Sequence, residues 1–162
     1  MKKIYLILAI IVITVFVSNF QYAKKETINA KLYYVDHSVL RLIPVNYNIY
    51  SEKKENACKE ILKKLVNGED NNHKILRVIP NIKNSADVKV KKNTAVVNLK
   101  EEFLNNFTDN KNHQLLAIYS IVNSLTSVDG IDTVQFLIDG EVKKIFFAGI
   151  DMRETFIPDY YI

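Results

Sequence analysis

Apolar and polar positions follow their clearest pattern between residues 114 and 141 of the chain. At 100° per residue, the first part of this segment places its apolar side chains within one arc roughly 160° wide, as expected for a helix packed on a core. These side chains are Leu115, Ile118, Tyr119, Ile121, Val122 and Leu125. Gly130 favours the end of that helix, and residues 133–138 then alternate between two faces as a strand does. The pattern therefore predicts a helix, a break and a strand.

A tight turn is predicted directly after this strand. Asp139 and Gly140 tolerate the two positive φ angles of a type I′ turn, which joins neighbouring antiparallel strands. We therefore expect residues 141–147 to return as the second strand of a hairpin.

Upstream, the pattern predicts two short strands followed by another helix. Residues 31–35 and 39–45 are rich in aromatic and branched side chains, which favour strands. Ser51 is a candidate cap for a helix that runs to about residue 66 and ends at Gly68. Its predicted buried face consists of Ala57, Cys58, Ile61, Leu62 and Leu65.

Shorter elements complete the order between the two helices. Residues 77–80 read as an extended piece, residues 88–91 pair with 94–99 as a hairpin, and residues 101–107 form a loose helical turn. Because the strands come as hairpins, we predict an α+β fold with two helices on one face of a largely antiparallel sheet. A doubly wound parallel sheet is the disfavoured alternative.

We expect the domain to span residues 26–148, with an aromatic tail at 149–162 packed on it.

Residues 4–20 are almost wholly apolar, and as a helix extended to residue 23 they span about 30 Å, the thickness of a hydrocarbon core. A cleaved signal peptide has a shorter apolar region and small residues at the cleavage site, and neither feature fits well. Residues 1–25 are therefore predicted to be an uncleaved membrane anchor through residues 4–23, with the domain extracytoplasmic. A cleaved and secreted form is the alternative.

The net charge of +4 belongs to this segment, because Lys2, Lys3, Lys24 and Lys25 account for the whole excess. The rest of the chain is balanced, and it shows no RNA-binding or helix-turn-helix signature. A balanced domain attracts no phosphate backbone, so we do not expect nucleic-acid binding.

A series of short apolar motifs carries a family resemblance. The motifs are LYYV at 32–35, LIPV at 42–45, LKKLVNG at 62–68, VIP at 78–80, AVVNL at 95–99, IVNSLT at 121–126 and VQFLIDG at 134–140. In this order they resemble the GerMN domain, a module of sporulation and germination proteins. The resemblance covers about residues 31–148 and implies one copy of a membrane-tethered, extracytoplasmic, non-enzymatic domain. It departs at Glu69, where the family has proline, and at Asn46, where a basic residue is usual.

No set of residues resembles a catalytic or metal centre. His37, His73 and His113 lie in separate predicted loops. The acidic residues near the central turn are better explained by turn chemistry than by the paired carboxylates of a glycosidase. We therefore expect no enzyme activity, no metal and no cofactor. The only cysteine, Cys58, is expected to be a small buried hydrophobe.

Residues 114–128 carry no charge, although a helix with a solvent-facing side normally places charges there. Opposite the apolar stripe lies a candidate interaction face, which consists of Leu116, Ser120, Asn123, Ser124 and Ser127. One interpretation is that another subunit or an envelope protein covers this face. The other is that the aromatic tail around Phe156 covers it within the same chain.

Two classes of function remain. The first is a structural assembly module acting in sporulation or spore germination. The second is an envelope-tethered binding domain for a small ligand or wall glycan, which would show an aromatic-lined cleft with a few convergent polar groups.

Overall fold

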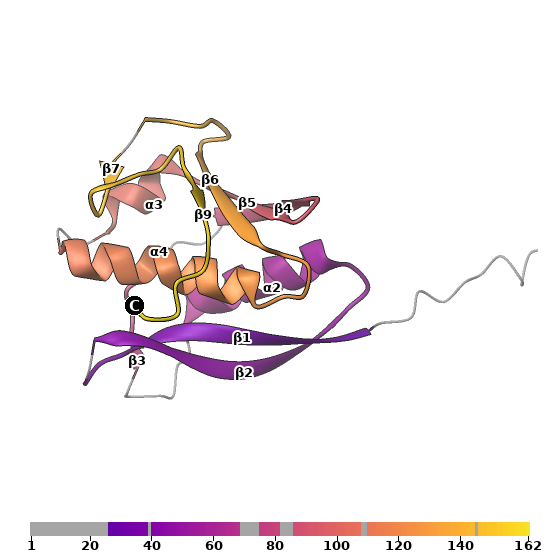
Figure 1. Cartoon of the computed structure of the whole chain (residues 1–162). Coiled ribbons are helices and arrows are strands. Elements are labelled where there is room, and N and C mark those ends of the chain that lie inside the picture. The colour runs from indigo at the N-terminus through magenta and orange to yellow at the C-terminus, as the bar shows by residue number, and fades with distance from the viewer. Residues whose placement is uncertain (1–25, 39, 69–74, 82–85, 108–109, 145) are drawn as a thin grey trace, which may run out of the picture.

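The computed structural model describes residues 26–38, 40–68, 75–81, 86–107, 110–144 and 146–162 (Figure 1). The predicted membrane anchor and His73 lie outside these residues. Within the described part of the chain, no helix has both the length and the apolar character needed to cross a membrane.

Two long strands open the domain, and both extend beyond their predicted limits. The elements are β1 (Glu26–Asp36), β2 (Arg41–Ser51), α2 (Lys54–Asn67), β3 (Ile75–Leu76), β4 (Ala86–Lys91), β5 (Thr94–Leu99), α3 (Glu101–Asn105), α4 (Lys111–Thr126), β6 (Thr133–Ile138), β7 (Phe146–Phe147), β8 (Ile150–Asp151) and β9 (Thr155–Phe156). The predicted hairpin of β4 and β5 and the short helix α3 are confirmed.

The strands form two main sheets, and α2 and α4 lie between them (Figure 1). The first sheet has the order β2-β1-β3 and is antiparallel, whereas the second has the order β4-β5-β6-β9. In the second sheet β5 and β6 run parallel, and α3 and α4 form the connection between them. The α+β class is therefore confirmed, but the expectation of one sheet with both helices on a single face was wrong.

The predicted inner face of α2 is confirmed. All five of its residues are buried in the core, and Gly68 ends the helix with a positive φ of 71°. The predicted cap was wrong, because Ser51 is the last residue of β2 and the N-cap position is Lys53. The Ser51 hydroxyl instead accepts a hydrogen bond from Lys53 N–H at 3.3 Å and donates to Lys53 O at 2.9 Å.

The turn after β6 forms as predicted, but the expected hairpin does not. Asp139 and Gly140 have φ angles of 51° and 83°, yet the ladder beyond them stops at a single bridge between Ile138 and Glu141. The edge of β6 pairs instead with β9, whose Phe156 is buried edge-on against Phe136, with ring centroids 5.2 Å apart. Residues 142–144 are Val-Lys-Lys and offer less apolar surface for this buried position.

Candidate functional site

Two serines of α4 and its C-cap residue, Ser127, hydrogen-bond to the backbone of β1 along the edge opposite β2. Tyr33 N–H donates to Ser124 Oγ at 2.8 Å, and Ser120 Oγ donates to Tyr33 O at 2.5 Å. Lys31 N–H donates to Ser127 Oγ at 2.8 Å, and the same hydroxyl lies 3.1 Å from Lys31 O. Because β3 pairs with only the last two residues of β1, these hydroxyls occupy the places of a neighbouring strand.

The candidate interaction face is consequently not an exposed surface. Leu116, Ser120, Asn123 and Ser124 are at most 5% exposed, and Ser127 is partly buried. The helix packs on the first sheet with one side and on the second sheet with the other, which explains why it carries no charged side chain from Gln114 onward. In the structure, β1 of the same chain lies against the serines of this face.

The C-terminal segment covers the part of this face that contains Asn123. Asn123 Nδ2 donates to Asp159 O at 2.6 Å, and Asp159 N–H donates to Asn123 Oδ1 at 2.9 Å. Asn123 itself is 0% exposed, so this amide is used entirely to hold the tail on α4. The next residue, Tyr160, is therefore fixed in position beside the first sheet.

Tyr160 packs against Tyr33 of β1. Their ring centroids are 5.6 Å apart with the ring planes inclined by 30°. Burial raises the pKa of Tyr33, and the neighbouring Tyr160 adds to the increase. Tyr160 is still 55% exposed, whereas Tyr33 is buried, so Tyr160 is the member of this pair that presents its ring to solvent.

An open groove of about 830 Å³ lies next to this aromatic pair. Its lining comes from β1, β2, the end of α4 and the tail, and consists of Asn29, Ala30, Lys31, Tyr33, Asn46, Asn48, Thr126, Ser127 and Tyr160. Strand alternation and register place Asn29 opposite Asn48 and Lys31 opposite Asn46 on one face of the sheet. This face turns away from α2, because Tyr47, which points the other way, donates its hydroxyl to Glu60 of α2 at 3.1 Å.

The outer edge of β2 is a second feature, because β2 lies at the end of its sheet. Leu42 N–H points outward, since it donates to Ile162 O at 3.2 Å. Backbone groups alternate along an antiparallel strand, and the β1–β2 register is continuous, so residues 46, 48 and 50 also direct their N–H and C=O groups outward. Residues 42–51 contain no charged side chain.

The edge of the second sheet at β4 is protected differently. Val90 N–H donates to Glu55 Oε2 of α2 at 3.1 Å, and Lys59 forms an ion pair with the same carboxylate at 3.0 Å. The hydrogen bond from Val90 and the contact with Lys59 lower the pKa of Glu55. The hydrophobic pattern of α2 identifies only its buried face, so the sequence analysis missed this contact.

The titratable residues are dispersed through the structure. Among the described residues, no group of three or more His, Cys, Asp and Glu side chains is arranged to hold a metal ion. Asp132 and Asp139 serve turns, since Asp132 Oδ2 accepts a hydrogen bond from Asn93 Nδ2 at 2.6 Å and Asp139 Oδ1 accepts from Glu101 N–H at 3.4 Å. Burial raises the pKa of Cys58 to about 11, which keeps the thiol protonated.

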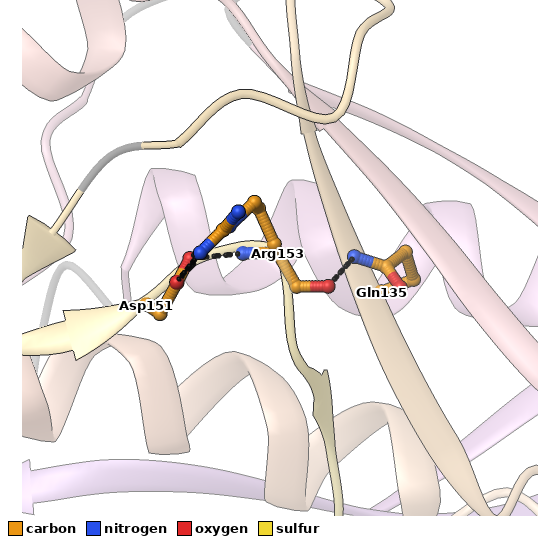
Figure 2. Close-up of polar contacts among 3 residues, drawn as sticks. All are labelled: Gln135, Asp151 and Arg153. Atoms are coloured by element: carbon orange, nitrogen blue, oxygen red, sulfur yellow. Dashed lines mark hydrogen bonds and ion pairs between the residues drawn. The ribbon is translucent and has the colours of Figure 1, made fainter.

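Figure 2 shows the ion pair between Asp151 and Arg153. The guanidinium donates from Nη2 to Asp151 Oδ2 at 2.5 Å and from Nε to Oδ1 at 3.0 Å. Arg153 O also accepts a hydrogen bond from Gln135 Nε2 of β6 at 3.3 Å. Side-chain and backbone hydrogen bonds from Arg153 lower the pKa of Asp151 to about 2. The pair fixes the turn between β8 and β9 on the second sheet.

Comparison with protein families gives one match that covers most of the described domain. The family model Germane, described as sporulation and spore germination, matches residues 31–144, which is more than half of the chain. The chain belongs to the Germane family. The GerMN-type domain predicted from the ordered motifs is therefore confirmed. Comparison with curated protein sequences finds no match.

Solved structures share the Germane fold. The first GerMN domain of the sporulation protein GerM from Bacillus subtilis is 24% identical with a TM-score of 0.52, covering 70% of this chain and 84% of that one. A Clostridium perfringens protein described as a lipoprotein is 18% identical with a TM-score of 0.55, covering 81% and 87%. The tandem GerMN domains of Bacillus subtilis GerM give 12% identity and a TM-score of 0.58, covering 86% of this chain and 48% of that one. The chain thus spans about half the length of the tandem structure.

The Germane match and the candidate site overlap only in part. The serines of α4 and most of the groove lie within residues 31–144, whereas Phe156, Asp159 and Tyr160 lie beyond the match. The Asn123–Asp159 contact therefore joins the family domain to a segment that the family pattern does not include.

Proposed function

We propose that this Germane-family chain is a non-catalytic assembly module of the sporulation or spore germination apparatus. Residues 4–23 tether it to the membrane, and the domain lies on the extracytoplasmic side. The sequence of the apolar segment and the family membership support this proposal. The partner that the geometry favours is a second copy of the chain.

The outer edge of β2 carries the proposal. The C-terminal residue Ile162 covers this edge at Leu42, but within the described residues no strand pairs with it from residue 46 onward. An uncovered strand edge pairs readily with another strand, and monomeric proteins usually discourage this with charged side chains or proline. Residues 42–51 lack such charges, so two copies of this part of β2 can approach one another without like-charge repulsion. Pro44 has no N–H to offer, so the usable donors lie at residues 46, 48 and 50.

The proposal is tested with Tyr50→Pro in the full-length protein. Proline removes the outward N–H of residue 50 without removing a hydrogen bond to β1, so self-association should weaken. Tyr50→Thr is the matched control, because threonine also removes the ring but retains the N–H and a high strand propensity. Sedimentation of the detergent-solubilised chain over a range of concentrations measures association, and thermal unfolding checks that both variants fold.

The same two variants also test whether self-association is needed for sporulation and germination. In a spore-forming host that lacks the wild-type gene, Tyr50→Thr should restore heat-resistant spores and germination, whereas Tyr50→Pro should not. A wild-type chain that stays monomeric at high concentration would contradict pairing between copies. Recovery of the protein in the soluble fraction after its synthesis would contradict the tether, which should resist alkaline and high-salt washing.

A further inference from the structure

The groove beside Tyr160 has features of a ligand site that the assembly role does not require. Its amide side chains are Asn29, Asn46 and Asn48, and all three are exposed. Within the described residues, none of these amides hydrogen-bonds to another protein group. Each amide offers both donors and an acceptor, so together they match a ligand that presents alternating donors and acceptors.

The aromatic wall of the groove is held in place before any ligand arrives. Asn123 fixes Asp159 by two hydrogen bonds, and Tyr161 N–H donates to Asp159 Oδ1 at 2.9 Å. Tyr160 lies between these fixed residues and packs on Tyr33, which is 8% exposed. A side chain that is already ordered loses little conformational entropy on binding, so Tyr160 is suited to stack against a ligand.

The charge of the lining narrows the class of ligand. Lys31 is the one cation among the described lining residues, and no carboxylate is present there. One cation is too few for a polyanion such as a nucleic acid, whose binding depends on many phosphate contacts. The groove is also open and polar, whereas compact apolar ligands favour enclosed apolar pockets.

We propose that this groove binds a strand of N-acetylated amino sugars, the type of glycan found in bacterial cell walls. The sugar ring presents a face of C–H groups to Tyr160, and its hydroxyl and acetamide groups exchange hydrogen bonds with Asn29, Asn46 and Asn48. An extended strand suits an open groove along β1 and β2, because successive sugars can lie along the strands. The site lies on the face of the sheet and not at its β2 edge, so it is separable from assembly.

Titration calorimetry of the full-length chain in detergent tests this site. Chitohexaose, a chain of N-acetylated glucosamine, is the probe, and cellohexaose, which lacks the acetamide groups, is the comparison. We expect saturable binding of chitohexaose and binding of cellohexaose that is weaker by about tenfold. Absence of chitohexaose binding, or equal affinity for the two sugars, would overturn the proposed ligand class.

Two neighbouring tyrosines give a matched pair of variants. Tyr160→Ala should weaken chitohexaose binding by about tenfold through loss of the stacking surface, and Tyr160→Phe should retain it. Tyr161→Ala is the control, because Tyr161 is fully exposed and does not line the groove. Thermal unfolding distinguishes lost contact from lost fold. Equal weakening by Tyr160→Ala and Tyr161→Ala in folded protein would exclude the groove as the site, whereas Tyr50→Pro should leave sugar binding unchanged.

Discussion

The side chain of Asn123 and the backbone of Asp159 form a pair of hydrogen bonds, at 2.6 Å and 2.9 Å, in which each residue both donates and accepts. This is how one strand would bind its neighbour, although the partners are a helix side chain and a C-terminal segment. The contact closes the domain on the side of α4 that the two sheets do not cover, and it leads to a direct test.

Asn123→Ala should lower the free energy of unfolding by about 1–3 kcal/mol, because it leaves partly buried backbone groups of Asp159 without partners. Chemical denaturation of the full-length protein measures the change. The control is Asn105→Ala in α3, whose side chain is exposed and which should change stability by less than about 0.5 kcal/mol. Equal effects of the two substitutions would show that the Asn123 contact contributes no specific stability.

Ser124→Ala should also lower the free energy of unfolding by about 1–3 kcal/mol, because Tyr33 N–H would lose its hydrogen-bond acceptor inside the protein. Thr126→Ala on the same helix is the comparison. The Thr126 hydroxyl donates at 2.8 Å to Val122 O, a carbonyl of its own helix, so no strand group depends on it. Hydrogen exchange at the Tyr33 amide should accelerate in Ser124→Ala and stay slow in Thr126→Ala. An unchanged rate in both would contradict the role of the serine in closing the β1 edge.

Val122→Asp should be severely destabilising, by roughly 3–5 kcal/mol, because Val122 is 0% exposed and a charge there has no partner. The same substitution at Val142, which is 55% exposed, should change stability by less than about 0.5 kcal/mol. The melting temperatures of the two variants measure this difference in stability. Similar melting temperatures would refute the assignment of this side of α4 to the core.

Low pH should lower the stability of the fold, in part through protonation of Asp151. Its pKa is lowered from 3.8 to about 2, first by the side-chain hydrogen bond from Arg153, so the folded state binds the proton less readily than the unfolded state. The resulting stability is present above the unfolded pKa and disappears as the pH falls from 3.8 to about 2. Asp151→Asn should therefore flatten the loss of stability over this interval, as followed by thermal unfolding at a series of pH values.

The control for acid unfolding is Asp129→Asn, because Asp129 is exposed and forms no ion pair or hydrogen bond within the described residues. This variant should show the same acid sensitivity as the wild-type protein. If Asp151→Asn retains the full wild-type dependence, the pair with Arg153 does not contribute to acid stability.

Local patterns predicted those parts of the fold whose partners are close in sequence. The buried face of α2, the end of that helix at Gly68 and the hairpin of β4 and β5 each depend on nearby residues. The predicted partner of β6, residues 141–147, was wrong. That segment and β9 compete for the same edge of β6, and burial of Phe156 favours β9. A sequence pattern records the turn at Gly140 but not the competing segment.

The candidate site was less predictable for a related reason. Residues 114–128 indeed carry no charge, but this pattern indicates only that the helix surface is covered and does not identify which segment covers it. The serine spacing would have given a better signal, because hydroxyls at 120, 124 and 127 lie on one side of a helix and can bind strand backbone. Asn29, Asn46 and Asn48 converge only through the β1–β2 register, which no local motif specifies.

The contacts between β1 and α4 also set the order in which the chain can fold during synthesis. They join residues 87 to 96 positions apart, so the first strand to be made waits for one of the last helices before its second edge is closed. Before α4 has formed, the backbone groups of Lys31 and Tyr33 on this edge are unpaired and can bind a strand of another chain. A ribosome stalled before Ser120 would hold an unfinished sheet, and such nascent chains should be the ones that chaperones bind most and proteases cut first.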